Sequence, residues 1–320
     1  MPRILVLGGT GYIGSAFVEE LRARGWDHRV LRRPELDYTQ FPLLLRFLRA
    51  ERFDFLVNCA GYSGKPNVDT CEIERADTLL GNVTLPLSIA NACAEAQLPW
   101  GQVSSGCIYS GAHVRNPDGT SRVERDLMEP RVHQELLDHP ERFTGFTEDD
   151  VPNFTFRNGP CSFYSGTKAL GEEVIAGVGN HYIWRLRIPF DARDNTRNFL
   201  SKLQRYSRVY DNVNSITHRG DFAKASLDLW LNKAAFGIYN VANPGWVTTR
   251  DIVAQIQKHL QPGKKFEFWR DDAEFYAVAA KTPRSNCLMD VSKLLAAGVQ
   301  IRPVEQAIEE SLRDWQPEIR

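Results

Sequence analysis

Short continuous apolar runs alternate along the chain with segments that have helical spacing. Ile4 to Leu7 is an uninterrupted apolar run, which is typical of a parallel strand buried on both faces. Helical spacing follows from about Tyr12 to Arg24. Further strands are predicted over 28–31, 53–57, 100–103 and 182–186, and helices over 41–50, 73–96, with a local kink at Pro86, and 164–175. This alternation predicts an α/β fold with a Rossmann-type doubly wound parallel sheet.

The alternation becomes irregular from Pro189 onward. A helix is predicted over 198–206 and a strand over 237–241, and Thr248 and Asp251 have the spacing of a capping box for a helix reaching Leu260. We therefore expect residues 1–188 to form the dinucleotide-binding domain. Residues 189–320 should form mainly a smaller, interleaved substrate-binding domain, with 237–260 returning to the main sheet.

Residues 112–150 differ in character from the rest of the first domain. They are charged and contain prolines, with one short amphipathic piece over 132–137. A segment of this length is too long for a plain loop. It is predicted to be a partly helical insertion near the mouth of the site.

Composition excludes several classes of protein. Of 320 residues, 42% are hydrophobic and 25% charged, and the net charge is −1, which gives no electrostatic footprint for nucleic acid or an anionic membrane. Met1 leads directly into a strand without a signal peptide, and no apolar run approaches the roughly 20 residues of a membrane helix. The six cysteines lack metal-type spacing, so reduced thiols in the cytoplasm and no metal site are expected. A homodimer is one possible assembly.

The first strand ends in the glycine-rich turn Gly8-Gly9-Thr10-Gly11-Tyr12-Ile13-Gly14. Gly8 would allow the tight turn, Gly11 would let the backbone approach a pyrophosphate, and Gly14 would let helix and strand pack closely. A glycine triplet alone is weak, but strand and helix stand on either side of it. We expect the turn to bind a dinucleotide, with Thr10, Tyr12 and Ile13 among the contacts; a purely structural turn is the alternative.

The second predicted strand ends in Arg32-Arg33, where an acidic residue would grip the ribose of NAD. Two arginines suit a 2′-phosphate instead, so NADP is the expected cofactor. If these arginines are merely solvated, NAD becomes the alternative. The remaining expected cofactor contacts are Asp37, at the adenine, Asn58, Ala60, Gly61 and Asn82, and the pair Tyr164 and Lys168.

Ser105 and the pair Tyr164 and Lys168 have the residue types that reduction of a ketone requires. A tyrosine is a poor proton donor and acceptor until its anion is stabilised, and a lysine one helical turn along supplies positive charge. The serine hydroxyl can make a second hydrogen bond to the carbonyl oxygen. Tyr-x-x-x-Lys alone occurs often by chance, but here it accompanies the glycine-rich turn and the serine at a strand end.

Several motifs together resemble one family. They are Gly64-Lys65-Pro66-Asn67-Val68-Asp69, Gly106-Cys107-Ile108, Tyr164 to Lys168, Arg197 to Lys202, and Pro283-Arg284-Ser285-Asn286. From Arg3 to about Trp315 the chain resembles extended short-chain dehydrogenase/reductases, and within them the dTDP-4-dehydrorhamnose reductases. It is most similar to the plant-type bifunctional enzymes that epimerise a nucleotide 4-keto-6-deoxyglucose at C3 and C5 and reduce it at C4.

This resemblance implies roles for further residues. Cys107 and Lys202 fall where the plant-type enzymes have the cysteine and lysine that exchange protons at C3 and C5. Arg284 and Asn198 would hold the nucleotide diphosphate, and Asn67 would contact the substrate. The structural alternatives are a buried filler for Cys107, a solvated helix residue for Lys202, and surface or capping positions for Arg284 and Asn198.

Three other functions occur in this fold, and the residues bear on each. A 4,6-dehydratase would have Asp-Glu where this chain has Gly106-Cys107, which argues against dehydration. A reductase without epimerase activity remains possible if Cys107 and Lys202 are inert. Relatives that bind NADP as regulatory subunits usually lose part of the catalytic set, whereas Ser105, Tyr164 and Lys168 are all present.

Overall fold

The computed structural model describes residues 1–317, and it confirms the α/β fold with a central parallel sheet. Every neighbouring pair of strands in this sheet runs parallel. Across the sheet the order is β13 (Gly237–Asn240), β8 (His181–Leu186), β4 (Trp100–Ser105), β3 (Phe55–Asn58), β1 (Arg3–Leu7) and β2 (Asp27–Leu31). β2 lies on one side of β1 and β3 lies on the other. The strand order therefore reverses at β1, and ligands bind at such a switch point, at the carboxyl ends of the strands, in open α/β sheets.

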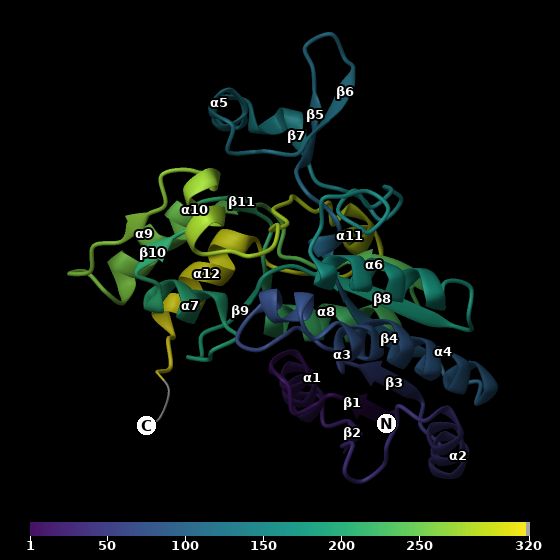
Figure 1. Ribbon diagram of the computed structural model, residues 1–320. Helices are drawn as coiled ribbons and strands as arrows, with labels where there is room; N and C mark the ends of the chain where they lie inside the picture. The colour runs from purple at the N-terminus through teal and green to yellow at the C-terminus, as the bar shows by residue number, and fades with distance from the viewer. Residues whose placement is uncertain (318–320) are drawn as a thin grey trace.

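Helices cover both faces of the sheet (Figure 1), because its strands are apolar on both sides. Ile4, Leu5, Val6 and Leu7 of β1 are completely buried. One face packs against α1 (Tyr12–Ala23), α8 (Arg219–Leu231) and α11 (Ser292–Ala296). The other packs against α2 (Phe41–Glu51), α4 (Leu85–Glu95) and α6 (Phe163–Ile175).

The glycine-rich turn has the backbone geometry that its sequence predicts. Gly8 has a φ of +72°, and a Cβ there would lie 2.5 Å from the backbone nitrogen of Ala60. A Cβ on Gly14 would lie 2.1 Å from the carbonyl oxygen of Gly8. Both glycines are needed for close packing, so the turn is held tightly against the end of β3.

The continuous helix predicted over 73–96 is wrong in its first half. Residues 68–72 form the 3-10 helix η1 (Val68–Glu72), and α3 (Arg75–Leu79) is separated from α4 by the π-helical turn η2 (Leu80–Thr84). Pro86 lies at the start of α4, where its missing N–H is tolerated. A π turn has one more residue than an α-helical turn, which changes the directions of the side chains beside it. In this turn the side chain of Asn82 is buried in the protein.

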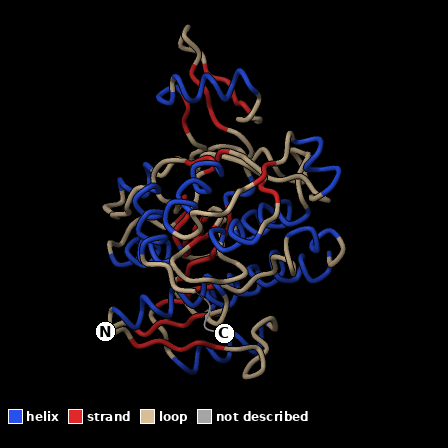
Figure 2. The backbone as a smooth tube through the Cα atoms, turned by 90° about the vertical axis from the view of Figure 1, so that its left-hand side faces the viewer, coloured by secondary structure: helices blue, strands red, loops and turns tan. Residues whose placement is uncertain are grey.

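The insertion is more strand-like than the sequence predicts. It contains an antiparallel sheet of β6 (Ser121–Glu124), β5 (Ala112–Arg115) and β7 (Phe143–Thr144), together with α5 (Pro130–Asp138) and the short η4 (Pro140–Arg142). The predicted amphipathic piece lies within α5. Figure 1 shows this module standing out from the body of the protein, and Val114 and Leu136 pack with Val213 and Leu288 at its base. Figure 2, turned by 90°, again shows the insertion projecting from the body of the protein.

The C-terminal part forms an apolar cluster of its own. Its helices are α7 (Phe199–Arg205), α9 (Thr249–His259), α10 (Asp272–Val278) and α12 (Val304–Arg313). Its strands are the short β9 (Pro189–Phe190), β10 (Arg208–Val209), β11 (Val213–Asn214), β12 (Thr217–His218), β14 (Val247–Thr248) and β15 (Glu267–Phe268). The capping box of Thr248 and Asp251 is confirmed.

Three segments after residue 189 pack with the main sheet. β13 adds to its edge, and α8 and α11 cover one face, whereas α9 packs in the C-terminal cluster. The division into two domains at residue 188 stays a prediction. Among the described residues, no helix combines the length and the apolar character that crossing a bilayer requires.

Candidate active site

The end of β1 forms a cradle that fits a dinucleotide. Within residues 1–317, no side chain caps the N-terminus of α1, so the first-turn N–H groups have no capping partner. Gly11, Thr10 and Gly61 are exposed around this helix end. Unpaired N–H groups and a positive helix end favour a pyrophosphate.

Asn58 and Ala60, two more of the expected cofactor residues, form the part of the cradle at the end of β3. The buried Asn58 donates to Gln102 Oε1 (2.8 Å) and accepts from the N–H of Ala60 (3.0 Å). These bonds fix the end of β3 beside the glycine turn. Asn58 thus supports the backbone of the cradle.

Arg32 and Arg33 are exposed immediately after β2. Arg32 Nε lies 3.7 Å from the carboxylate of Glu35, and the guanidinium of Arg33 lies over the ring of Tyr38. The pKa of Asp37 is lowered by its hydrogen bonds with Thr39. The two arginines thus offer positive charge beside the cradle, where a 2′-phosphate would lie.

Asn82 links two sides of the site. Its side chain is buried, accepts from the N–H of Tyr62 (2.9 Å) and donates to the carbonyl of Tyr62 (2.8 Å) and to Thr167 Oγ1 (3.2 Å). All three hydrogen bonds are to protein groups. These bonds hold the loop after β3 against α6, and the expected contact of Asn82 with the cofactor stays a prediction.

Ser105, Cys107 and Tyr164 come together at the carboxyl edge of the sheet. Ser105 ends β4, and its hydroxyl accepts from the N–H of Cys107 (3.2 Å) at the start of a 3-10 turn, η3 (Gly106–Ile108). Tyr164, in the first turn of α6, packs against the apolar cluster that contains Cys107. Burial and the nearby Cys107 raise the pKa of Tyr164, while a hydrogen bond with Ser105 and the charge of Arg187 lower it.

Lys168 lies one turn further along α6. Its ammonium donates to the carbonyl oxygen of Val103 in β4 (3.1 Å). Burial lowers its pKa, and Cys107 and Glu172 raise it. Lys168 is thus fixed between α6 and β4, next to the strand that presents Ser105.

A buried ion pair lies behind these residues. Arg185 in β8 and Glu172 in α6 meet at 2.7 Å with side chains 3% and 7% exposed. Ser104 donates to Glu172 Oε1 (2.5 Å), and Arg185 donates to the hydroxyl of Tyr109 (3.0 Å). Of the two serines that end β4, Ser104 is therefore engaged in this network, whereas Ser105 faces Tyr164.

Lys202 lies in a second group of cations around the loop 61–72. It is half-buried on α7, and its pKa is lowered by burial and then by Arg197 and Arg284. Arg197 donates to the carbonyl of Gly64 (2.8 Å), and Arg284 forms a bidentate ion pair with Asp69. Arg197 and Arg284 thus hold the loop against the C-terminal part.

The 3-10 helix η1 joins the two groups. The exposed Asn67 caps it by accepting from the N–H of Asp69 (2.8 Å). Glu72, at the end of η1, accepts from the N–H of Phe163 (2.6 Å), next to Tyr164. Asp69 pairs with Arg284, one of the cations beside Lys202. One short element therefore contacts the surroundings of both Tyr164 and Lys202.

Asn198 caps α7 from a buried position. It is completely buried, its amide nitrogen donates to Asp191 and Arg193, and its Oδ1 accepts from the N–H of Leu200. These contacts favour the capping alternative. The expected contact of Asn198 with the diphosphate stays a prediction.

Two charged residues around the site, Arg187 and Glu72, are not among those that the sequence predicts. Arg187 is buried in the strand continuation after β8, donates to Asn214 Oδ1 (2.7 Å), and lowers the pKa of Tyr164. Glu72 accepts from the N–H of Phe163 (2.6 Å) and from Thr282 Oγ1 (2.9 Å). Arg187 had a signal, because an arginine in an otherwise apolar buried strand needs a partner or a function.

A parallel sheet with a glycine-rich turn at its switch point, and a Ser-Tyr-Lys set at the same edge, defines an extended short-chain dehydrogenase/reductase fold. The chain belongs to the RmlD substrate-binding domain family, whose model matches residues 2–316. The resemblance to dTDP-4-dehydrorhamnose reductases and plant rhamnose synthases is confirmed.

Two plant relatives, both from Arabidopsis thaliana, match most of the chain. The bifunctional dTDP-4-dehydrorhamnose 3,5-epimerase/dTDP-4-dehydrorhamnose reductase is 29% identical over 95% of this chain and 90% of its own length. A trifunctional UDP-glucose 4,6-dehydratase/UDP-4-keto-6-deoxy-D-glucose 3,5-epimerase/UDP-4-keto-L-rhamnose-reductase is 28% identical over 96% of this chain. The chain spans 41% of the length of that trifunctional relative.

Two solved structures have the same fold. The L780 UDP-rhamnose synthase of Acanthamoeba polyphaga mimivirus matches with a TM-score of 0.80 and 21% identity, over 98% of this chain and 99% of its own. A dTDP-4-dehydrorhamnose reductase from Bacillus anthracis, solved in complex with NADP, matches with a TM-score of 0.73 and 19% identity, over 98% of both chains.

Proposed function

We propose that this chain is an NADPH-dependent enzyme that epimerises a nucleotide-4-keto-6-deoxyhexose at C3 and C5 and reduces it at C4. The observation that carries the proposal is the meeting of Ser105, Cys107 and Tyr164 at one sheet edge, beside the dinucleotide cradle. Lys202 and its two arginines lie beyond the same loop. The names of the plant relatives support both halves of this activity.

The reductive half uses groups that are fixed in the protein. NADPH, when bound, supplies the hydride. A phenol is protonated near neutral pH, so Tyr164 can give its proton to the C4 oxygen once its anion is stabilised. Ser105 donates a second hydrogen bond to that oxygen, and Lys168 supplies positive charge along α6.

The epimerising half uses the acidity of C–H groups beside a ketone. A lysine takes up a carbon-bound proton only in its neutral form, and the lowered pKa of Lys202 favours that form. In the proposal, Lys202 and Cys107 act from opposite faces of the ring, one removing and the other returning a proton. Arg284 and Asn67 would contact the substrate nearby.

One observation favours a narrower function. Cys107 is only 6% exposed, as a packing residue would be, and a chain with inert Cys107 and Lys202 would reduce the ketone without epimerisation. Incubation of candidate nucleotide 4-keto-6-deoxyhexoses with NADPH, followed by NMR of the product, separates the two. Inverted C3 and C5 with a C4 alcohol supports the proposal, whereas a reduced sugar with unchanged C3 and C5 supports the narrower function.

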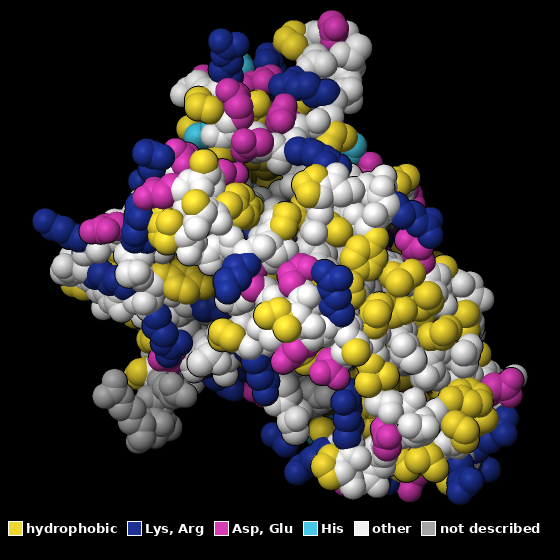
Figure 3. All heavy atoms as spheres, viewed as in Figure 1, with side chains coloured by type: hydrophobic (Ala, Val, Ile, Leu, Met, Phe, Trp, Pro, Cys, Tyr) yellow, Lys and Arg dark blue, Asp and Glu magenta, His cyan; other side chains and the backbone are white. Residues whose placement is uncertain are grey.

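The homodimer that the sequence leaves possible has a candidate surface. Ile73, Leu79, Leu80 and Phe156 are exposed on and around α3, and Figure 3 shows hydrophobic side chains gathered on that side of the molecule, over α6. A second copy of the chain would cover this face in the proposed homodimer. Light scattering of the unaltered protein and of the Ile73→Glu variant tests the homodimer. We expect the unaltered protein to have the mass of a dimer and the variant, which places a charge on the apolar face, to dissociate more readily.

A cytoplasmic location stays a prediction.

A further inference from the structure

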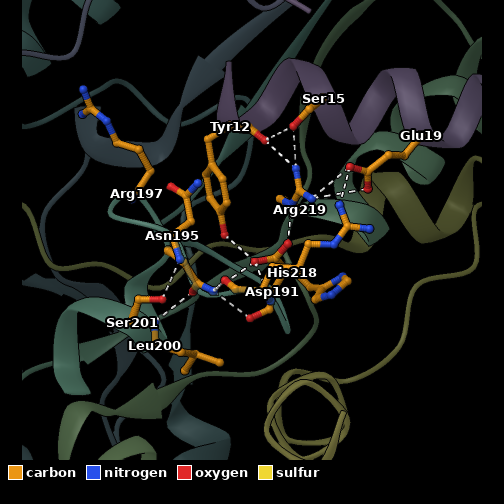
Figure 4. A network of polar contacts seen from close by, with 12 residues as sticks. Tyr12, Ser15, Glu19, Asp191, Asn195, Arg197, Leu200, Ser201, His218 and Arg219 are labelled. Atoms are coloured by element: carbon orange, nitrogen blue, oxygen red, sulfur yellow. Dashed lines mark hydrogen bonds and ion pairs between the residues drawn. The ribbon is translucent and has the colours of Figure 1, made fainter. Parts of the chain in front are cut away.

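Asp191 lies at the centre of a network that joins the dinucleotide cradle to α7 (Figure 4). It is 5% exposed and directly follows β9. Its Oδ1 accepts from the hydroxyl of Tyr12 (2.9 Å), which comes from the glycine-rich turn, and from the amide of Asn198 (2.9 Å), which caps α7. One carboxylate oxygen is therefore shared by the cofactor side and the substrate side of the protein.

Arg219 makes the second connection. It directly follows β12, which pairs in parallel with β9, so Arg219 and Asp191 leave neighbouring strands at the same end. Arg219 Nε donates to Asp191 Oδ2, and its terminal nitrogens donate to the carbonyl of Tyr12 (2.8 Å), to Ser15 Oγ (2.7 Å) and to Glu19 (3.2 Å). The arginine thus contacts the first two turns of α1 and the carboxylate at once.

The network reaches Lys202 through the cap of α7. Asn198 Oδ1 accepts from the N–H of Leu200 (3.0 Å), and its carbonyl accepts from the N–H of Lys202 (3.0 Å). The backbone of Lys202 is therefore held by the residue whose side chain is held by Asp191. A change in the orientation of the carboxylate would tilt the first turn of α7 and move the lysine.

Burial makes the network sensitive to any shift at the turn. Both Asp191 and Arg219 are 5% exposed, so water cannot replace a lost contact. The pKa of Tyr12 is raised by burial and by the charge of Asp191, so its hydroxyl remains a donor. Removal of one partner from a buried charged network is costly, and the other members must rearrange to compensate.

We infer that Asp191 is a positioning residue that couples occupation of the dinucleotide cradle to the placement of Lys202. The inference rests on the proposed function, because that function gives the cradle an NADP ligand and Lys202 a role. A pyrophosphate at the start of α1 would draw on the N–H groups next to Tyr12. The hydroxyl of Tyr12, which donates to Asp191, and its backbone carbonyl, which accepts from Arg219, then transmit the change to Asp191 and to α7.

Backbone hydrogen–deuterium exchange, measured by mass spectrometry with and without NADP⁺, tests the coupling. In the unaltered protein, NADP⁺ should slow exchange in the turn 8–14 and also in α7, by about five-fold or more for a coupling of ordinary size. In Asp191→Asn and in Tyr12→Phe the turn should still be protected, but α7 should not respond. Tyr12→Phe removes one hydroxyl only and guards against the case in which Asp191→Asn does not fold.

Tyr239→Phe is the matched control. Tyr239 is also a buried tyrosine, and its hydroxyl donates to the carbonyl of Ala235 (2.9 Å), outside the network. In this variant NADP⁺ should protect α7 as in the unaltered protein. A merely structural role for the tyrosine hydroxyl of residue 12 would lower stability without removing the response of α7 to NADP⁺.

The outcomes separate the inference from the function on which it rests. Protection of the turn without protection of α7 in the unaltered protein would overturn the coupling and leave the proposed function standing, as would equal protection of α7 in the variants. Absence of any protection by NADP⁺ would overturn the cofactor assignment and the coupling with it. The rate at which the sugar exchanges protons with solvent gives an independent test. If NADP⁺ raises this rate in the unaltered protein but not in Tyr12→Phe, the coupling is supported.

Discussion

Arg284 pairs with Asp69 through two contacts, of 2.6 Å and 2.9 Å, between its guanidinium nitrogens and the two carboxylate oxygens. The two residues are 215 positions apart in the chain. Asp69 belongs to the loop beside the catalytic edge and Arg284 to the C-terminal part. The pair therefore ties the loop to the C-terminal part and engages the arginine expected to hold a diphosphate.

Arg284→Gln should raise the KM for the nucleotide sugar. A hydrogen bond to a charged group contributes about 1.5–3 kcal/mol, which corresponds to roughly ten-fold or more in affinity. Asp69→Asn should change KM in the opposite direction, because Arg284 then loses a competing anion. Arg250→Gln, which breaks the ion pair of a largely exposed arginine with Asp211, is the control and should leave KM unchanged. A KM that is the same in all three variants would exclude Arg284 from the substrate site.

Arg32→Ala combined with Arg33→Ala should shift the cofactor preference from NADPH toward NADH by at least about ten-fold, because two charge-assisted contacts to a 2′-phosphate are lost. Initial rates with the two cofactors measure the ratio. Arg22→Ala removes an exposed arginine of α1 as a control. An unchanged ratio in the double variant would mean that the arginines are only solvated.

Tyr164→Phe should abolish reduction and preserve proton exchange. Loss of a positioned acid costs about 10²–10⁴-fold in rate, whereas exchange at C3 and C5 does not need the phenol. Cys107→Ala should give the reverse: exchange is lost, and a substrate already inverted at C3 and C5 is still reduced. Cys161→Ala, which changes a half-buried thiol outside the proposed machinery, serves as the control. Equal losses of both activities in Cys107→Ala would argue for a packing role.

The pH dependence of proton exchange should report Lys202. Burial, Arg197 and Arg284 lower its pKa from the ordinary 10.5, so the neutral base forms at lower pH and exchange should rise with pH through a midpoint below that value. Arg197→Gln removes one positive neighbour, which raises the pKa of Lys202 and should move the midpoint to higher pH. A midpoint that moves to lower pH, or does not move, contradicts the assignment of Lys202 as the base.

Arg185→Met should destabilise the fold strongly, because Glu172 would be left as an unpaired buried charge behind the site. Breaking one side of a buried pair costs about 3–5 kcal/mol. Arg157 pairs with the neighbouring Glu173 in an exposed position, so Arg157→Met should cost less than about 1 kcal/mol. Urea unfolding measures both, and equal costs would show that the buried pair is not a special anchor.

The sequence was most informative where one local pattern decides the structure. The apolar run of β1, the glycine turn and the capping box of Thr248 depend on neighbours in the chain, and all are present as predicted. The π turn at Asn82 was missed because it depends on the packing of α6, where a Cβ on Gly171 would lie 2.1 Å from the carbonyl of Asn82. The strands of the insertion had a turn signal, Asp118-Gly119, that its charged composition obscured.

The same distinction holds for the site. Ser105, Tyr164 and Lys168 could be singled out as a candidate set, because the chemistry itself fixes their types and spacing, and their catalytic role stays a prediction. The partners of Asn198 and Arg284 could not be predicted, since Asp191 and Asp69 meet them only in the folded chain. Long-range ion pairs have no local pattern.

The most direct measurement supplies a nucleotide 4-keto-6-deoxyhexose and NADPH to the protein in deuterated water and locates deuterium in the product by NMR. The account predicts deuterium at C3 and C5, inverted configuration at both carbons and an alcohol at C4. A reduced product with protons retained at C3 and C5 would contradict it.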